Sequence, residues 1–386
     1  MSTAPTADDK AFSALVTKVN TNAAKKSQSS RKLVYTGDEI EELRRKFPPI
    51  PTGIPNLDED LGGGIVRGCI TTVWGEAGLG KTGLAMQTAK NAQDMGLRVV
   101  WYLGEPPFDF RLADVLGLDY RDSNKFLFLQ PRDTAEEMIE ATYAFLYDPE
   151  KREPHGLVGL LVIDSLTSLV PAAAVKALDE KGADAATIGR QASMLSGWLQ
   201  GMTGRGMLLG GTAVYCTCQV RTSISNAGGF PAMAGGKAIK FYSKVLIKLA
   251  QEKVSMTKIA GREVGVGRTN RYEIEKNQII GQPMIKGTYA YTFQYGIDDS
   301  LEIFSRGTEW ALITKERAKN PTTNKTDTRW LFHTVGMAYE FFGNTDAARE
   351  QLKVNEVLKV AMRTMLQMGK PKGGIYEPQQ IGRAHV

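Results

Sequence analysis

The sequence reads Gly75-Glu76-Ala77-Gly78-Leu79-Gly80-Lys81-Thr82 between an apolar run, 69–74, and a segment with helical patterning. Glycines allow a turn this tight, and its successive N–H groups then point at anionic oxygens beside the start of a helix. We therefore predict a phosphate-binding loop between a strand and a helix. A glycine-rich turn without a ligand is the less favoured alternative.

Two side chains of this loop suit a nucleoside triphosphate and its metal ion. Lys81 places a cation beside the β- and γ-phosphates, and Thr82 offers the hydroxyl oxygen that Mg²⁺ accepts as a ligand. Asp164 ends the apolar run 157–163, and open α/β sheets bind ligands at the carboxyl ends of their strands. We expect Thr82 and Asp164 to hold Mg²⁺ beside ATP. A capping role for Asp164 is less favoured, because the nucleotide loop needs a metal partner.

Glu105 ends the next predicted strand, 98–103, after the phosphate loop and its helix. A carboxylate at this point lies near the γ-phosphate and can orient and deprotonate an attacking water. A metal-binding or ion-paired glutamate is the competing interpretation. The pattern alone supports the two equally.

Gln219 also follows an apolar run, and it leads into segment 220–237, which is rich in Gly and Ser. Such a segment is expected to lack a fixed shape without a ligand. Its cationic and aromatic side chains include Arg221, Phe230 and Lys237. Cations can contact the phosphates of a single nucleic-acid strand and an aromatic ring can stack on its bases, while Gln219 can sense the γ-phosphate by a hydrogen bond. An ordinary surface loop is the alternative.

The chain from residue 51 to about residue 300 alternates strand-like runs with helix-like segments, which predicts an α/β fold on a mostly parallel sheet. The predicted strands are 69–74, 98–103, 159–164, 212–217, 244–250, 272–276 and 289–295, and the predicted helices are 81–95, 134–147 and 186–203. The last strands follow one another without helices and are expected to extend the sheet in antiparallel fashion.

Both ends of the chain carry separate elements. Helical spacing of apolar residues predicts a helix over 8–20, followed by a polar linker over 21–31. That helix either packs on a neighbouring subunit or folds back on its own core. Beyond residue 300 we predict a small α/β appendage that ends in a helix over 347–366. The last six residues, 381–386, match a translated sequencing adapter, and we hypothesise that they are a scar.

Composition agrees with a globular protein: 42% of the 386 residues are hydrophobic and 23% are charged. No apolar run could cross a membrane and the N-terminal residues lack the pattern of a secretory signal, so no membrane partner and a cytoplasmic location are expected. The three cysteines have neither zinc-site spacing nor a disulfide framework. A net charge of +6 is compatible with a polyanionic partner.

Together these segments resemble the RecA family of strand-exchange recombinases, including the phage branch typified by UvsX, so that a phage-encoded protein is one interpretation. The similarity runs in order over about residues 33–300. A phosphate loop is common to many families. Its combination with Gln219-Val220-Arg221 and with the Gly-Gly-Lys-Ala-Ile-Lys-Phe-Tyr stretch at 235–242 is specific.

The resemblance implies a RecA-like P-loop core, a mostly parallel twisted sheet flanked by helices, over residues 36–300. It also implies an N-terminal helix and polymerisation segment at 1–35, in which 33–35 pair with the adjacent protomer, and a small C-terminal domain at 301–380. The implied activity is ATP-dependent: a helical homo-oligomeric filament forms on single-stranded DNA, pairs it with homologous duplex and exchanges strands. A single-strand-binding protein and a loader are further partners that the resemblance suggests.

Roles are carried over residue by residue. Glu105 becomes the water-activating base and Gln219 the γ-phosphate sensor, while Lys276 reaches the neighbour's γ-phosphate. The implied catalytic residues are Glu105, Lys81, Gln219 and Lys276; the nucleotide contacts are Gly75, Glu76, Ala77, Gly78, Leu79, Gly80, Lys81, Thr82 and the adenine contact Asp109; the DNA contacts are Arg190, Arg221, Phe230, Lys237 and Lys240. The implied DNA-binding loops are 172–187 and 220–237.

Two departures from the family's pattern concern turnover more than filament formation. Family members place a second cation two residues after the position of Lys276, where this chain has the neutral Gln278, and Cys218 replaces a polar residue before Gln219. A hexameric DNA helicase or a circadian KaiC-type ATPase on the same core is the main alternative. A non-catalytic coat protein that uses ATP only as a switch is another, against which Glu105 argues.

Overall fold

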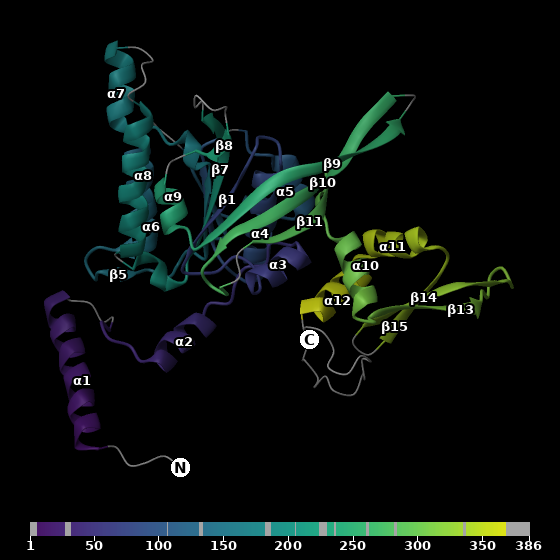
Figure 1. Ribbon diagram of the computed structural model, residues 1–386, viewed down its shortest axis with the longest axis horizontal. Coiled ribbons are helices and arrows are strands. Elements are labelled where there is room, and N and C mark those ends of the chain that lie inside the picture. The colour runs from purple at the N-terminus through teal and green to yellow at the C-terminus, as the bar shows by residue number, and fades with distance from the viewer. Residues whose placement is uncertain are drawn as a thin grey trace. The chain divides into compact units, whose positions relative to one another are not determined.

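Six strands run parallel and place their carboxyl ends along one edge of a sheet (Figure 1). Their bounds are β1 (Ile70–Gly75), β2 (Val99–Leu103), β3 (Phe126–Leu129), β6 (Leu160–Asp164), β7 (Ala213–Ser223) and β9 (Val245–Ile259). They lie in the order β9-β1-β7-β6-β2-β3, each parallel to its neighbours. This computed structural model describes residues 6–27, 32–105, 107–130, 134–181, 187–204, 206–223, 230–234, 237–259, 262–281, 284–334 and 337–367.

The chain divides into two units. The first consists of Met1–Thr52, Asp60–Ala250 and Tyr272–Lys286, and the second of Gly53–Glu59, Gln251–Arg271 and Gly287–Val386. The helix α3 (Pro55–Leu61) and the strands β9, β10 (Arg262–Asn277) and β11 (Ile285–Thr292) have residues in both.

Helices cover both faces of the parallel sheet in the first unit. Successive strand residues point to opposite faces, so a fully apolar strand needs cover on both sides. The helix α4 (Lys81–Asp94) contacts β1, β2, β6 and β7. Trp74, Tyr102 and Ile163 instead join a core with α6 (Ala135–Leu146) and α8 (Thr187–Gly204). Smaller elements of this unit are α1 (Ala7–Ser27), α2 (Gly37–Arg45), α5 (Phe110–Leu116), β4 (Tyr147–Asp148), β5 (Glu153–Pro154), α7 (Ala172–Lys181), β8 (Phe230–Met233) and α9 (Lys237–Tyr242).

The predicted α/β fold is confirmed. Each of the seven predicted strands and the three predicted core helices has a counterpart within a few residues, apart from β7, β9 and β10, which extend well beyond their predicted bounds. Antiparallel extension is also confirmed where β11 pairs with β12 (Gly296–Asp298). The edge strand β3 was not predicted.

Two boundary predictions are wrong. The linker expected over 21–31 is helical to Ser27, because its Ala and Lys residues favour a helix. The helix expected over 347–366 is two helices, α11 (Thr345–Val354) and α12 (Glu356–Gln367), since the Asn355 side chain accepts from Leu358 N and starts a new helix. Residues 381–386 lie outside the described residues.

The two expected DNA-binding loops are more regular than predicted. Residues 172–181 of the first form helix α7. In the second, β7 continues to Ser223 and pairs antiparallel with β8, so that described parts of 220–237 form a hairpin. Strand β7 pairs with β1 as far as Gln219, and its pairing with β8 continues from Val220 to Ser223.

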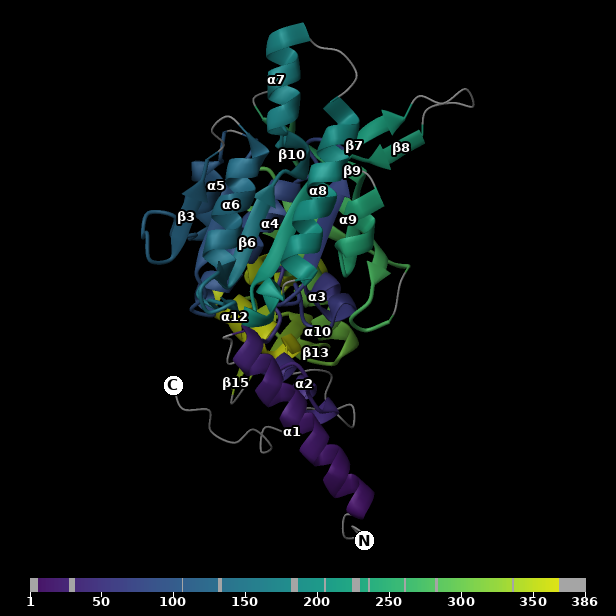
Figure 2. The same ribbon diagram turned by 90° about the vertical axis from the view of Figure 1, so that its left-hand side faces the viewer.

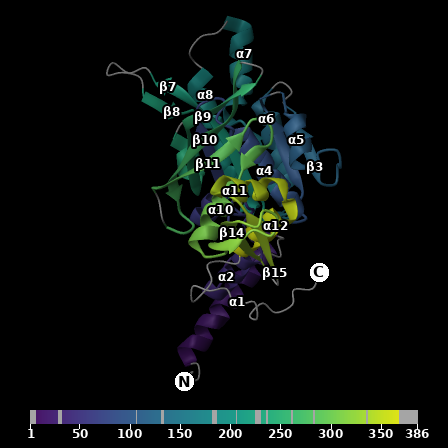
Figure 3. The ribbon, with the colours of Figure 1, turned by 90° about the vertical axis from the view of Figure 1, so that its right-hand side faces the viewer.

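The second unit has its own core. The helices α10 (Ser300–Glu309), α11 and α12 pack on a three-stranded antiparallel sheet, β13 (Ile313–Lys319), β14 (Thr326–Thr334) and β15 (Met337–Phe342) (Figure 3). Buried apolar side chains from the helices and the sheet form one cluster, which includes Ile303, Phe332, Leu352 and Met362.

A buried carboxylate lies beside this core. Glu302 is 7% exposed, and its Oε2 accepts a hydrogen bond from Asn56 N at 3.1 Å. Burial raises the pKa of Glu302 to about 7; Asp299 and Asp58 add to the rise, while the Asn56 bond and Arg306 oppose it. The neutral acid is thus the form that the folded unit favours.

Glu302→Gln should remove a pH dependence of stability. The pKa of Glu302 rises from an ordinary 4.5 to about 7 on folding, so its contribution is complete below 4.5 and is lost as the pH rises through 7. The loss corresponds to roughly 3 kcal/mol at most. Calorimetric unfolding between about pH 5.5 and about pH 8 should show a falling Tm for the unaltered protein and a flatter profile for the variant. The matched control is Glu309→Gln, an exposed glutamate of the same helix; equal slopes in all three proteins would contradict the prediction.

Candidate nucleotide and DNA site

The phosphate loop joins β1 to α4 at the carboxyl edge of the sheet. Gly75 and Gly80 have φ angles of 156° and 82°, values that side chains with a Cβ rarely adopt. A Cβ at Gly75 would also lie 2.5 Å from Leu249 O, so the loop can leave β1 here only with glycine. The predicted strand-loop-helix setting of the phosphate loop is confirmed.

Lys81 points back into this loop. Its Nζ donates to Gly75 O at 3.0 Å and to Glu76 O at 2.7 Å, and the residue is only 8% exposed. The ammonium group is therefore held inside the turn, where the N–H groups of the loop and the start of α4 favour an anion.

Asp164 is the buried carboxylate at the end of β6. It is 3% exposed, and Thr217 Oγ1 donates to it at 2.6 Å. Burial raises the pKa of Asp164, while hydrogen bonds from Thr217 and Thr82 and the nearby charge of Lys81 lower it. The hydroxyl of Thr82 and the carboxylate of Asp164 thus meet as predicted. A buried carboxylate with an oxygen partner and a raised pKa suits Mg²⁺, which would offset its charge. The described residues contain no cluster of three or more acidic, His or Cys ligands.

Glu105 lies at the centre of a hydrogen-bond network at the same edge. Its Oε1 accepts from Gln219 Nε2 at 2.8 Å, from Thr167 Oγ1 at 3.3 Å and from Ser165 Oγ. These donors come from the ends of β6 and β7, so the carboxylate is oriented by neighbouring strands. No cation forms an ion pair with Glu105 among the described residues, which removes the ion-paired alternative there.

Gln219 links Glu105 to the phosphate loop. Strand pairing sets Gln219 directly opposite Gly75, because β7 lies between β1 and β6. The backbone of Gln219 also accepts from Ala234 N at 3.0 Å, where the hairpin beyond it returns. Gln219 therefore bonds to the predicted general base Glu105, pairs with Gly75 at the start of the phosphate loop, and bonds to Ala234 where the hairpin ends.

Asp109 begins helix α5. Its Oδ1 accepts from Leu112 N at 2.8 Å, and the carboxylate is about half exposed. The side chain thus has a local capping role, and its exposed oxygen is available to a ligand. Its neighbours Phe108 and Phe110 belong to an aromatic cluster at the β2-β3 side of the sheet.

The predicted DNA contacts gather near one end of the first unit, where α7 and the β7-β8 hairpin project beyond the carboxyl edge (Figure 2). Arg190 is exposed, and its Nη1 donates to Ala173 O of α7 at 2.5 Å. Lys237 and Lys240 are exposed on α9, which follows the hairpin. Arg221 and Phe230 lie on β7 and β8, and their side chains lie outside the described parts.

Lys276 contacts the end of α9 rather than the phosphate loop of its own chain. Its Nζ donates to Lys240 O at 2.8 Å and to Phe241 O at 3.2 Å, at the carboxyl end of α9. Burial and the charge of Lys244 lower the pKa of Lys276. Gln278 directly follows β10, and its N–H donates to Lys244 O. This bond lies just before β9 begins, at the edge of the sheet opposite the phosphate loop.

Sequence reasoning missed three hydroxyl residues of the site. Thr217 bonds to Asp164, and Ser165 and Thr167 bond to Glu105. Thr217 could have been found, because residues two apart in a strand share a face and Thr217 precedes Gln219 by two. Ser165 and Thr167 gave a weaker signal, their position just after a strand-ending aspartate.

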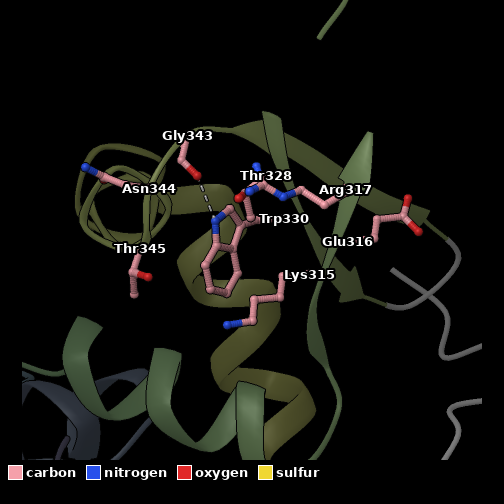
Figure 4. Close-up of a pocket in the computed structure, with 8 residues that line it drawn as sticks. All are labelled: Lys315, Glu316, Arg317, Thr328, Trp330, Gly343, Asn344 and Thr345. Atoms are coloured by element: carbon pink, nitrogen blue, oxygen red, sulfur yellow. Dashed lines mark hydrogen bonds between the residues drawn. The ribbon is translucent and has the colours of Figure 1, made fainter. Parts of the chain in front are cut away.

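A cavity of about 490 Å³ lies in the second unit and is not part of this site (Figure 4). Lys315 lies over the ring of Trp330, whose Nε1 donates to Gly343 O at 3.1 Å. None of the predicted site residues lines it. The cavity lies instead along the β13-β14-β15 sheet of the second unit.

Comparison with known proteins identifies the family. The described residues contain no helix long and apolar enough to span a bilayer. A family model of the RecA N-terminal domain matches residues 20–298. Protein RecA of Amycolatopsis mediterranei is 32% identical over 280 residues, which cover 72% of this chain and 74% of the relative. Protein RecA of Mycobacteroides abscessus is 31% identical over 292 residues, 75% of this chain and 78% of the relative. The chain belongs to the RecA family of ATP-dependent DNA recombinases, as its motifs predict.

Proposed function

We propose that the carboxyl edge of the first unit binds and hydrolyses ATP and that the Gln219–Glu105 contact couples the nucleotide to DNA. The loop 75–82 would hold the phosphates and Asp109 would contact the adenine. Thr82 and Asp164 would hold Mg²⁺, which when bound offsets phosphate charge. The buried setting of Asp164 and its hydroxyl partners support this assignment.

Glu105 is the proposed base. A water aligned with the γ-phosphorus transfers a proton to the Glu105 carboxylate as its oxygen forms the new P–O bond, while the bond to the β-γ bridging oxygen breaks and ADP leaves. Ser165, Thr167 and Gln219 orient the carboxylate through the donors described above. Lys81 stays with the terminal phosphates and balances the charge that the leaving group acquires.

Gln219 is the proposed coupling residue. Its amide donates to Glu105 Oε1 at 2.8 Å. A γ-phosphate beside Gly75 competes for that amide, and because β7 runs unbroken from Gln219 into the hairpin, a shift of the amide is passed to the segment that faces DNA. The Gln219 O to Ala234 N bond ties the returning strand to the same residue.

The proposed ligand of that face is a single DNA strand, which the filament pairs with homologous duplex. Arg190, Lys237 and Lys240 are exposed cations, and Arg221 and Phe230 lie on the hairpin. Contacts of this kind are phosphate-driven, salt-sensitive and nearly independent of sequence. A helical homo-oligomer, a single-strand-binding protein, a loader and a cytoplasmic location complete the proposal.

Glu105→Gln should separate hydrolysis from assembly. The amide keeps the shape and the hydrogen bonds but cannot accept the proton of water, so phosphate release should fall on the order of 100-fold to 10,000-fold. Sedimentation with single-stranded DNA and ATP should be retained. Undiminished phosphate release would show that another group is the base.

Gln219→Ala should uncouple DNA binding from the nucleotide, because it removes the amide that chooses between Glu105 and phosphate. Anisotropy of a labelled single strand, at one fixed salt concentration, should give similar affinities with ATP, with ADP and with neither. The unaltered protein should favour ATP, as should the matched control Gln200→Ala, an exposed glutamine of α8. If the variant still binds the single strand more tightly with ATP than with ADP, as the unaltered protein does, the coupling role of Gln219 is contradicted. Strand-exchange yield with homologous against heterologous duplex should fall in parallel.

Asp164→Asn should weaken the metal site without weakening the fold. The pKa of Asp164 is raised because burial disfavours its charge, so a neutral amide should leave the ligand-free Tm unchanged or higher. The increase in Tm that Mg²⁺ and ATP cause should disappear, and hydrolysis should fall on the order of 100-fold. Because the carboxylate must be deprotonated to bind the ion, the Mg²⁺ affinity of the unaltered protein should rise with pH. The control is Asp94→Asn on α4; a variant that keeps the ligand-induced Tm increase would contradict the assignment.

A further inference from the structure

Two lysines meet at the edge of the sheet opposite the phosphate loop. Lys244 N donates to Ile70 O at 2.8 Å, at the first residue of β1, and Gln278 N donates to Lys244 O at 3.0 Å. The six residues of β1 rise about 3.3 Å each, so roughly 17 Å of strand separate this edge from Gly75. Neither Lys244 nor Lys276 is therefore placed to contact the nucleotide of its own chain.

Both ammonium groups are held by neutral partners. Lys276 donates to the carbonyls of Lys240 and Phe241, and Lys244 Nζ donates to Gln278 Oε1 at 3.3 Å. Neither forms an ion pair with a carboxylate among the described residues. The pKa of Lys276 is lowered by burial and by Lys244, so the two charges affect each other.

Unbalanced like charges of this kind favour an anionic ligand that carries at least two charges. Clustered cations without acidic partners repel one another, and a polyanion relieves that repulsion. Two of the proposed ligands are polyanions: the DNA strand and the terminal phosphates of ATP. Helix α7 and the β7-β8 hairpin project beyond the carboxyl edge (Figure 2), whereas Lys244 is bonded to Ile70 at the amino end of β1, which favours the nucleotide.

The nucleotide must then belong to another copy. A head-to-tail assembly brings the amino edge of one protomer against a different surface of the next, here the carboxyl edge with its phosphate loop. Lys276 lies on β10 and Lys244 directly precedes β9, and backbone hydrogen bonds of Lys244 to Ile70 and Gln278 hold it at this edge of the sheet.

We propose that Lys244, oriented by the amide of Gln278, is a second phosphate-contacting cation that acts with Lys276 on the ATP bound by the neighbouring protomer. The inference rests on the proposed ATP hydrolysis and on the role that the resemblance implies for Lys276. It assigns to the residue before β9 a charge that position 278 of this chain lacks, and it makes Gln278 a positioning residue for that charge.

Lys244→Ala and Lys244→Gln test it first. DNA-dependent kcat should fall about 10-fold or more in both, with a smaller change in KM, because the cation acts mainly on charge that develops in the transition state. Lys244→Arg should retain most of the activity. The matched control is Lys286→Ala, an exposed lysine of β11 that is ion-paired with Glu273. Unchanged kcat in both neutral variants would overturn the proposal.

A charge-relocation variant separates charge from structure. Lys244→Ala combined with Gln278→Lys returns a cation to the same edge from the neighbouring position, and kcat should recover at least in part. A packing role for Lys244 would not be rescued in this way, so a double variant as impaired as Lys244→Ala counts against the proposal.

Mixed filaments test whether the cation acts on the neighbour. Lys244→Ala lacks the cation and Glu105→Gln lacks the base, but where a Lys244→Ala site faces a Glu105→Gln neighbour both groups are present. Random equimolar mixing should restore hydrolysis at about one quarter of the interfaces. No restoration would place Lys244 in its own protomer's chemistry and overturn the inference.

Lys276→Ala distinguishes this inference from the proposal beneath it. Impaired hydrolysis in Lys276→Ala with normal hydrolysis in the Lys244 variants would overturn the role of Lys244 alone. Normal hydrolysis in both would overturn the role of Lys276 as well.

Discussion

The parallel pairing of β1 with β7 is the constraint on which the site depends. It sets Gln219 opposite Gly75, and the next strands in the sheet, β6 and β2, bring Asp164 and Glu105 to the same edge. A slip of one residue in β7 would turn Gln219 to the other face of the sheet, away from Glu105. Every residue of β1 and β6 is buried, so a slip would also place side chains of different size in a close-packed core, and this packing helps to fix the geometry of the site.

Burial disfavours the charged form of two carboxylates, but their surroundings lead to different outcomes. Asp164 and Glu302 are both almost fully buried, and burial raises the pKa of each. Asp164 has hydroxyl partners and a nearby ammonium group, which keep its charge accessible and suit a metal ion. Glu302 has one backbone donor and acidic neighbours, and its pKa is raised to about 7, so its neutral form prevails only below that pH. The hydrogen-bond donors and charges around a buried carboxylate, rather than its degree of burial, decide whether it can bind a cation.

The sequence predicted the fold, and it selected residues that the structure brings to one edge of the sheet, because both leave local patterns. A phosphate loop between a strand and a helix is local, and so are apolar runs that end in Asp164, Glu105 and Gln219. The Glu105–Gln219 contact could not be predicted, since it depends on the order β7-β6-β2, which no local pattern states. The β7-β8 hairpin could not be predicted either, because glycine-rich composition does not distinguish an irregular loop from a pair of antiparallel strands. The extension of α1 through 21–27 was missed for the opposite reason, as polar composition concealed good helix formers.

Opposite edges of one sheet carry complementary halves of the proposed chemistry, and this has a consequence for assembly. A monomer holds ATP, Asp164 and Glu105 at one edge, whereas Lys244 and Lys276 lie roughly 17 Å away at the other. No rotation of side chains brings these halves together within one chain. A two-fold contact would join like surfaces and leave the halves apart, so the complete site needs a head-to-tail interface, which continues into a helix unless its rotation closes a ring. If Lys244 and Lys276 act as proposed, hydrolysis is confined to assembled protein, and each protomer's turnover depends on the neighbour that supplies its cations.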